Sequence, residues 1–164
     1  MFPKPLTDKA KTLLEICERK KLMLATVESC TGGLLAGCLT AIPGSSSVVE
    51  RGYVTYSNRA KIEEVGVDPA LLERHGAVSR EVAAAMAAGA LRHAPVDLAA
   101  GITGVAGPGG GTAEKPVGLV FISAAAKGEP PVVRESRFPG DRDAIREASV
   151  SVALDMLLEL ARSR

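Results

Sequence analysis

LMLATVESCTGGLLAGCLTAI, residues 22–42, is the stretch that decides the fold of this chain. Residues 22–27 are a short apolar run that is typical of a buried strand, and residues 34–42 have the apolar spacing of a helix. That helix is expected to end where Pro43 and Gly44 follow it. ESCTGG, residues 28–33, lies between strand and helix. The stretch is therefore a strand–turn–helix unit of the kind from which α/β proteins are built.

The same alternation of strands and helices continues on both sides of this stretch. Helices are predicted at residues 8–20, 58–66, 81–93 and 142–162, the last three with Asn58, Ser79 and Asp141 as N-caps. Strands are predicted at residues 53–56, 98–103, 117–125 and 132–138, the last two as a hairpin. Helices that link successive strands favour a parallel sheet with helices on both faces, and the hairpin adds antiparallel strands. We expect one α/β domain over residues 1–164, a three-layer α/β/α sandwich with a mainly parallel, mixed sheet.

Composition and charge exclude several classes of function. Twenty basic against nineteen acidic residues leave a formal net charge of +1, and aromatic residues make up only 3%. The chain therefore lacks both the basic surface and the stacking aromatics of a nucleic-acid-binding protein. Cys17, Cys30 and Cys38 do not have the spacing of metal ligands, and no leader or membrane-spanning run is present. We expect a cytoplasmic protein with no metal, cofactor, membrane or nucleic-acid partner, and the sequence leaves a homo-oligomer open.

Ser29 is expected beyond the carboxyl end of a strand, where ligands bind in open α/β sheets. The first N–H groups of the following helix have no partner inside it. The backbone of Cys30, Thr31, Gly32 and Gly33 is therefore expected to supply oxyanion donors. Gly32 and Gly33 also let a substrate approach without a Cβ in the way. Ser29 is either a nucleophile or an ordinary N-cap of the helix.

Cys30 is the neighbouring alternative nucleophile, because a thiol is intrinsically more reactive than a hydroxyl. It would need a base such as His75 or His93, and both histidines are expected on the surface. We therefore expect a buried, inert Cys30, and no Ser-His-Asp triad.

Lys61 is the candidate base. If Asn58 caps its helix, Lys61 lies in the first turn, where the helix dipole, partial burial and Arg59 all lower the pKa of its ammonium group. A base that works near neutrality needs a pKa about 3 units below the ordinary value of about 10.4. Tyr56 is expected to relay the proton or to hold the lysine. The alternative is an exposed lysine on a helix surface that carries nearby glutamates.

Residues 104–116 form a glycine-rich loop that either wraps a small anionic ligand with its N–H groups or is a surface excursion. Substrate contacts are expected from this loop and its surroundings, namely from Thr103, Gly104, Gly107, Glu114 and Arg142. Arg142 opens the last helix, where a positive charge is unfavourable. Either a ligand phosphate binds there, or Asp141 or Asp143 pairs with the arginine.

Six motifs follow one another along the chain. They are ATVESCTGG (25–33), GYVTYSN (52–58), HGAVS (75–79), GVAGP (104–108), EKPVG (114–118) and FPGDR (138–142). In sequence and order this series resembles the CinA C-terminal domain family, and the resemblance extends over nearly the whole chain. Motifs this numerous and ordered do not coincide by accident.

The resemblance implies a nicotinamide-nucleotide amidohydrolase (NMN deamidase), which converts nicotinamide mononucleotide and water to nicotinate mononucleotide and ammonia in pyridine nucleotide salvage. The family's catalytic serine, lysine and tyrosine fall on Ser29, Lys61 and Tyr56. A small-molecule nucleotide is then the partner, no cofactor is needed, and Arg142 with the glycine loop is expected to hold the ribose phosphate. One alternative is a catalytically silent nucleotide-binding or interaction module linked to competence or DNA damage. Another is an amidase for a different small amide.

Overall fold

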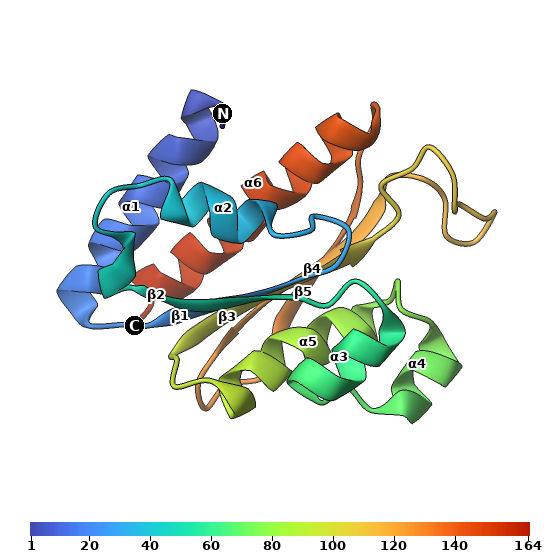
Figure 1. The fold of residues 1–164 in the computed structure, drawn as a ribbon, viewed down its shortest axis with the longest axis horizontal. Coiled ribbons are helices and arrows are strands. Elements are labelled where there is room, and N and C mark those ends of the chain that lie inside the picture. The colour runs from blue at the N-terminus through green and yellow to red at the C-terminus, as the bar shows by residue number, and fades with distance from the viewer.

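A five-stranded sheet with the order β2-β1-β3-β4-β5 forms the middle layer of the computed structural model, which describes residues 1–164 (Figure 1). The strands are β1 (Leu24–Glu28), β2 (Val49–Val54), β3 (Leu98–Gly104), β4 (Leu119–Ala126) and β5 (Val132–Arg137). β1 pairs in parallel with both β2 and β3, whereas β3 with β4 and β4 with β5 are antiparallel. The mixed sheet predicted from the sequence is confirmed.

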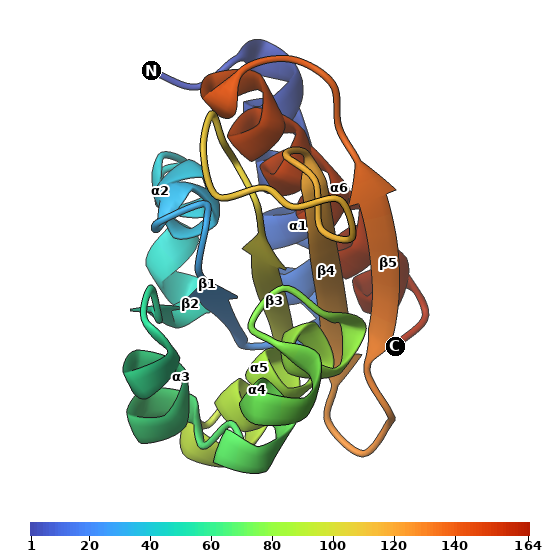
Figure 2. The same cartoon turned by 90° about the vertical axis from the view of Figure 1, so that its right-hand side faces the viewer.

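Helices cover both faces of this sheet and complete the predicted three-layer sandwich. One face carries α1 (Lys4–Lys20), α2 (Leu34–Thr40) and α6 (Arg142–Arg162). The other carries α3 (Asn58–Val65), α4 (Pro69–His75) and α5 (Arg80–His93). A short 3-10 helix, Ser45–Ser47, precedes β2. Figure 2 shows α3, α4 and α5 together on the side away from α1 and α6.

The central strands are buried on both faces, which is why they read as continuous apolar runs. In β1, Leu24 belongs to a core of 28 buried residues shared with α1, α2 and α6. Ala25 and Val27, the residues that alternate with it, belong to a second core of 13 buried residues shared with α5. All eight residues of β4 are buried as well. Packing from both sides therefore fixes the ends of β1 and β3 relative to the helices.

Three element predictions need correction, and the first is that α1 begins at Lys4 and not at residue 8. β2 begins at Val49 and ends at Val54, rather than spanning residues 53–56. Glu50, Arg51 and Gly52 follow Val49 in this strand, and such a polar and glycine-containing run hides an edge strand from a sequence pattern. α4 was not predicted at all, because its seven residues are too few to show a helical period. The Asp68-Pro69 pair that caps and opens it was the available signal.

The helix caps agree with the sequence except at one position. Ser79 Oγ accepts from the N–H of Val82, and Asp141 Oδ1 accepts from the N–H of Ala144, as predicted for α5 and α6. Ser57, and not Asn58, caps α3. Asn58 is the first helical residue instead, which moves every later position of α3 along by one.

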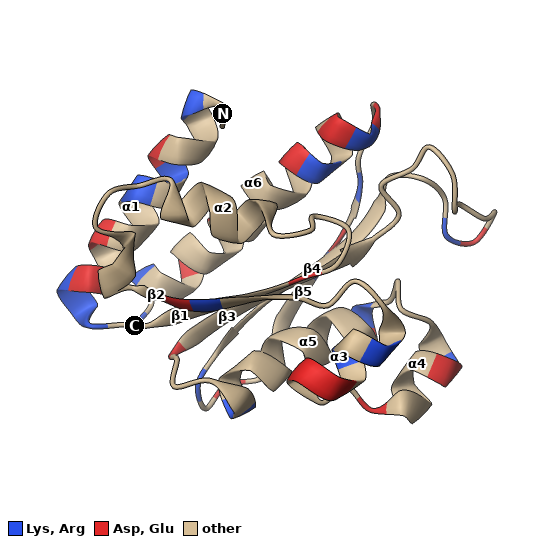
Figure 3. Ribbon diagram, viewed as in Figure 1, with Lys and Arg blue, Asp and Glu red and all other residues tan.

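Charged side chains lie mainly along the outer helices (Figure 3). Basic and acidic residues occur side by side on α1 and α6, and few are found on the central strands. Lys4 and Asp8 form one such pair on α1, with Nζ 2.6 Å from Oδ2. No helix in the chain combines the length and the apolar character needed to cross a membrane.

Candidate active site

The carboxyl ends of the three parallel strands meet at a cavity of about 310 Å³. Ser29 follows β1 directly, Tyr56 comes just after β2, and Thr103 lies at the end of β3. Ligands of open α/β sheets bind at this edge. The cavity is lined by Ser29, Cys30, Tyr56, Asn58, Lys61, Ala77, Val78, residues 103–107, Gly109, Gly110 and Arg142.

The turn that carries Ser29 is fixed by its own backbone. The N–H of Ser29 donates to the carbonyl of Ile102 in β3 at 2.9 Å, and the N–H of Gly32 donates to the carbonyl of Ser29 at 3.0 Å. Gly32 and Gly33 have φ angles of +56° and +98°, a region that glycine adopts without strain. Neither glycine lines the cavity. Both glycines suit the backbone conformation of the turn, and the surface at which a substrate was predicted to approach them lies outside the cavity.

The first N–H groups of α2 already have a partner. The carboxylate of Glu28 accepts from the N–H of Leu35 at 2.9 Å and from that of Ala36 at 3.1 Å. Four residues were predicted to supply oxyanion donors: Cys30, Thr31, Gly32 and Gly33. Of these, only Cys30 lines the cavity.

Lys61 is the largest fully buried side chain of the protein, with 1% of its surface exposed. Its Nζ lies 3.0 Å from Ser29 Oγ, 2.8 Å from the carbonyl oxygen of Thr55 and 3.3 Å from that of Tyr56. No carboxylate pairs with it. Burial without a counter-ion disfavours the ammonium form and lowers the pKa of Lys61 to about 8. The alternative of an exposed surface lysine is therefore excluded.

Of the predicted causes of this shift, burial acts and the neighbouring Arg59 does not. Arg59 is exposed and pairs with Glu63 across one turn of α3, with Nε 2.6 Å from Oε1. Desolvation alone lowers the pKa of Lys61, and the charge of a Cys30 thiolate would oppose that effect. Lys61 is the fourth residue of α3 rather than the third, because the helix begins at Asn58.

Tyr56 contacts Lys61 through its backbone and not through its ring. The residue is 61% exposed, and its phenol oxygen accepts from Nη2 of Arg142 at 3.2 Å. Nη1 of the same arginine donates to the carbonyl of Gly107 at 2.7 Å. Tyr56 thus holds the lysine, as predicted, but does so with its backbone carbonyl. The phenol of Tyr56 has no hydrogen bond to Lys61 through which it could relay a proton. Arg142 pairs with neither of the adjacent aspartates, so that alternative is also excluded.

The competing nucleophile and the two histidines lie as expected. Cys30 is 6% exposed, and burial raises the pKa of its thiol to about 11, so that it is not ionised at neutral pH. Neither His75 nor His93 lines the cavity. His93 is exposed, with Nδ1 2.9 Å from the carbonyl of Gly89. The chain therefore has no Ser-His-Asp triad at Ser29.

The glycine-rich loop forms one wall of the cavity. Three of its predicted substrate contacts line that wall, namely Thr103, Gly104 and Gly107. Glu114 does not: it is exposed and lies outside the cavity. Lys115 ties the loop to the opposite side, because its Nζ donates to the carbonyl of His75 at 2.5 Å. This contact anchors the loop beside the cavity. A loop that only extended over the surface would have no such contact.

Sequence reasoning missed four residues that contribute to the site. The carbonyl of Thr55 is a backbone atom, which has no signature in the side-chain pattern. Asn58 was interpreted only as a helix cap, although it lines the cavity. Ala77 and Val78 form part of the wall within HGAVS, a motif that offered no reactive group. The hydroxyl of Thr55 is buried without a hydrogen-bond partner.

The electrostatics of the cavity suit an anion. No acidic residue lines it, and its two basic residues are Lys61 and Arg142. Because Lys61 is poised to lose its charge, Arg142 is the permanent cation of the site. The chain offers no group of three or more His, Cys, Asp or Glu side chains that could hold a metal ion.

Comparison with known proteins places this geometry in a family. Residues 6–161 match the model of the CinA C-terminal domain. A CinA-like protein of Mycolicibacterium vanbaalenii is 57% identical over 134 residues, which are 82% of this chain and 32% of that protein. The chain thus spans about a third of the length of the curated relatives it matches.

Solved structures show the same fold over the full chain. The crystal structure of a competence/damage inducible protein from Agrobacterium tumefaciens is 46% identical, with a TM-score of 0.96 and 98% of both chains covered. A CinA superfamily protein from Escherichia coli is 36% identical, with a TM-score of 0.90, covering 94% of this chain and 90% of that one. The chain belongs to the CinA C-terminal domain family.

Proposed function

We propose that the chain is an amidohydrolase that converts nicotinamide mononucleotide and water to nicotinate mononucleotide and ammonia, with Ser29 as nucleophile and Lys61 as base. The observation that carries the proposal is the contact of 3.0 Å between Lys61 Nζ and Ser29 Oγ in a buried setting without a counter-ion. The substrate is the one implied by the resemblance to the family.

The three partners of Lys61 can hold a neutral amine that accepts the serine proton. The carbonyl oxygens of Thr55 and Tyr56 can only accept, so they take the two N–H bonds of a neutral amine. The lone pair that remains can then accept the hydroxyl proton of Ser29, whose Oγ lies 3.0 Å away. With a pKa of about 8, about one molecule in ten carries neutral Lys61 at pH 7. That fraction is enough for a general base that works near neutrality.

Acylation follows from this arrangement. Lys61 takes the Ser29 proton as Oγ attacks the carboxamide carbon, and the carbonyl oxygen becomes an oxyanion. The N–H of Cys30, next to the nucleophile and at the cavity wall, is the donor proposed for that oxyanion. Lys61 then gives its proton to the amide nitrogen, the C–N bond breaks, ammonia leaves, and the nicotinoyl group stays on Ser29 as an ester.

Deacylation repeats the chemistry with water. Neutral Lys61 takes a proton from water, and the resulting hydroxide attacks the ester carbon. The proton on Lys61 returns to Ser29 Oγ as the ester bond breaks, which releases nicotinate mononucleotide and restores the enzyme. Each proton that Lys61 accepts is delivered within the same half-reaction, so the amine ends neutral.

Arg142 and the glycine-rich loop are proposed to bind the ribose phosphate. Arg142 lies at the rim with two guanidinium nitrogens directed to Tyr56 and Gly107, and no acidic residue of the cavity repels an anion. A planar guanidinium binds phosphate oxygens in pairs. In the proposed binding mode the phosphate lies at the rim and the carboxamide at the buried end, near Ser29.

The test is hydrolysis of nicotinamide mononucleotide by the purified chain, followed as ammonia release and nicotinate mononucleotide formation. Ser29→Ala should lower kcat by about 10⁴-fold or more with the thermal transition unchanged. Cys30→Ser should retain most activity, and Ser47→Ala, at a remote exposed serine, is the matched control. Hydroxylamine should divert the acyl-enzyme to the hydroxamate.

Two outcomes would contradict the proposal. Wild-type activity that survives in Ser29→Ala but is lost in Cys30→Ser would transfer the nucleophile to the thiol. A well-folded wild-type chain that releases no ammonia would favour the silent binding module, and preference for free nicotinamide would favour a different amide as substrate.

A further inference from the structure

The carboxylate of Glu28 organises the backbone on one side of Ser29. Glu28 is the residue directly before the nucleophile and is 1% exposed. Its Oε1 accepts from the Thr31 hydroxyl at 2.7 Å and from the N–H of Leu35 at 2.9 Å. Its Oε2 accepts from the N–H of Ala36 at 3.1 Å. One carboxylate therefore joins the end of β1, the turn after Ser29 and the first turn of α2.

Arg146 holds the same turn from another element. It lies on α6, where its Nε donates to the carbonyl of Cys30 at 3.1 Å and its Nη2 donates to the carbonyl of Thr31 at 3.2 Å. More than a hundred residues separate the arginine from these carbonyls, so the contact exists only in the folded chain. The planar guanidinium fixes two successive carbonyls at once, which a single ammonium group cannot do.

We propose that Glu28 and Arg146 are positioning residues that hold the Ser29 hydroxyl against Lys61. The inference rests on the proposed function, because it assigns these two residues a part in the reactivity of that serine. Neither residue lines the cavity, so neither touches the substrate. Both act on the backbone of residues 30–36 and through it on Ser29 Oγ, 3.0 Å from the base. A misplacement of about 1 Å at such a contact typically costs about 100-fold in rate.

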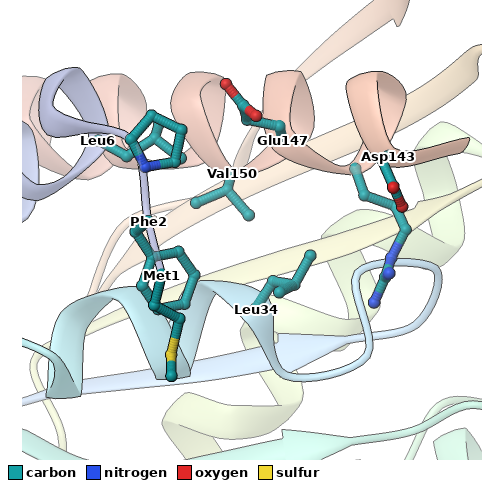
Figure 4. A pocket seen from close by; sticks show the side chains of 9 residues that line it. Met1, Phe2, Leu6, Leu34, Asp143, Glu147 and Val150 are labelled. Carbon is teal, nitrogen blue, oxygen red and sulfur yellow. The ribbon is translucent and has the colours of Figure 1, made fainter. Parts of the chain in front are cut away.

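The place of Arg146 allows its role to be tested by chemical rescue. Arg146 is part of the lining of a groove of about 220 Å³ between the N-terminal residues, α2 and α6 (Figure 4). Asp143 and Glu147 line the same groove, and neither has an ion-pair partner. Truncation of Arg146 would extend this groove to the carbonyls of Cys30 and Thr31. Two carboxylates at its mouth favour entry of a free guanidinium ion.

The first experiment compares wild type, Arg146→Ala and Arg146→Lys, with Glu147→Gln as the control on the next position of α6. We expect Arg146→Ala to lower kcat about 100-fold with KM unchanged, and Arg146→Lys to recover only part of that loss. Millimolar guanidinium chloride should raise the kcat of Arg146→Ala about tenfold or more, and sodium chloride at equal ionic strength should not raise it. Wild type and Glu147→Gln should not respond.

Glu28→Gln tests the other side of the turn. The amide is close in shape to the carboxylate, but its NH₂ group faces an N–H donor of α2 and cannot accept from it. We expect kcat to fall about tenfold with KM unchanged, while the pH midpoint of kcat/KM stays where Lys61 sets it. A shift of that midpoint would show that Glu28 acts on the base electrostatically, and would overturn its positioning role.

Acylation of Ser29 by p-nitrophenyl acetate separates this inference from the proposed function. The burst of nitrophenolate and the mass of the acetylated protein report the serine without any nucleotide. If wild type acylates but does not hydrolyse nicotinamide mononucleotide, the substrate proposal fails, and a slow, guanidinium-rescued burst in Arg146→Ala still supports positioning. Full acylation rates in folded Arg146→Ala and Glu28→Gln would overturn the inference. A loss of the acylation rate in Arg146→Ala that guanidinium does not restore would also overturn it. So would a wild-type protein whose Ser29 is not acylated.

Discussion

The inner and outer ends of the cavity use the same kind of residue in opposite ways. At the inner end, Lys61 is 1% exposed, has no counter-ion and meets the half-buried Ser29. At the outer end, Arg142 is exposed and binds the phenol of Tyr56 and a loop carbonyl. Burial lowers the pKa of Lys61, so that a fraction of the molecules carries it as a neutral amine near neutral pH, whereas the exposed guanidinium of Arg142 keeps its charge. In the proposed function, the difference in solvent access between Lys61 and Arg142 therefore separates the base from the phosphate-binding residue.

Removing the inner amine should have the largest effect. Lys61→Met keeps an unbranched side chain but no lone pair to accept the Ser29 proton, so kcat should fall about 10³-fold. KM for nicotinamide mononucleotide should change little, because the amine contacts Ser29 and not the phosphate. Steady-state kinetics measure both, with Lys127→Met at an exposed turn as the control. A large rise in KM with kcat retained would show that Lys61 binds the substrate. It would then contradict the proposed difference between Lys61 and Arg142.

The pH dependence of wild type sharpens the same contrast. Only neutral Lys61 accepts a proton, so kcat/KM should rise with pH, tenfold per unit below about pH 8, and level off above it. Between pH 6 and pH 9 the increase should be about 100-fold. The profile is measured at constant ionic strength with substrate well below KM. A profile that is flat over this range, or that falls with rising pH, would contradict a lysine base.

Arg142→Met tests the outer end. Loss of a charged hydrogen bond to phosphate typically costs about 1.5–3 kcal/mol, so KM for nicotinamide mononucleotide should rise about 10- to 100-fold with kcat nearly unchanged. Nicotinamide riboside, which lacks the phosphate, should be hydrolysed equally by wild type and variant. Arg59→Met removes an exposed arginine outside the cavity and is the matched control. An equal effect on both substrates would show that Arg142 does not bind the phosphate.

Tyr56→Phe should have the smallest effect. The change removes the oxygen that accepts from Arg142 but leaves the backbone carbonyl that holds Lys61. The bond lost is exposed and 3.2 Å long, and Arg142 keeps its bond to the carbonyl of Gly107, so the change should cost about 1 kcal/mol and raise KM about fivefold with kcat intact. A fall in kcat of about 100-fold would instead support the proton relay predicted from the sequence. The same steady-state assay decides between the two.

The local elements of the fold could be predicted wherever the chain carries its own signal. Asp141 at the start and the apolar spacing beyond it gave α6 its observed bounds, and ESCTGG gave the strand-to-helix turn. α4 was not predicted, and the first part of β2 was missed because edge strands tolerate polar residues. The site prediction brought Ser29, Lys61 and Arg142 to the same cavity, but included Glu114, which is exposed outside it.

What the sequence determined by itself is the order of its elements and the residue types available at their ends. Residues close along the chain set these features, through caps, turns and periodicity. Only the tertiary structure decided that the amine of Lys61 meets a hydroxyl 32 residues away, and that Glu28 and Arg146 hold the turn between them. The lowered pKa of Lys61 belongs to this second group, because desolvation depends on everything that packs around a charge.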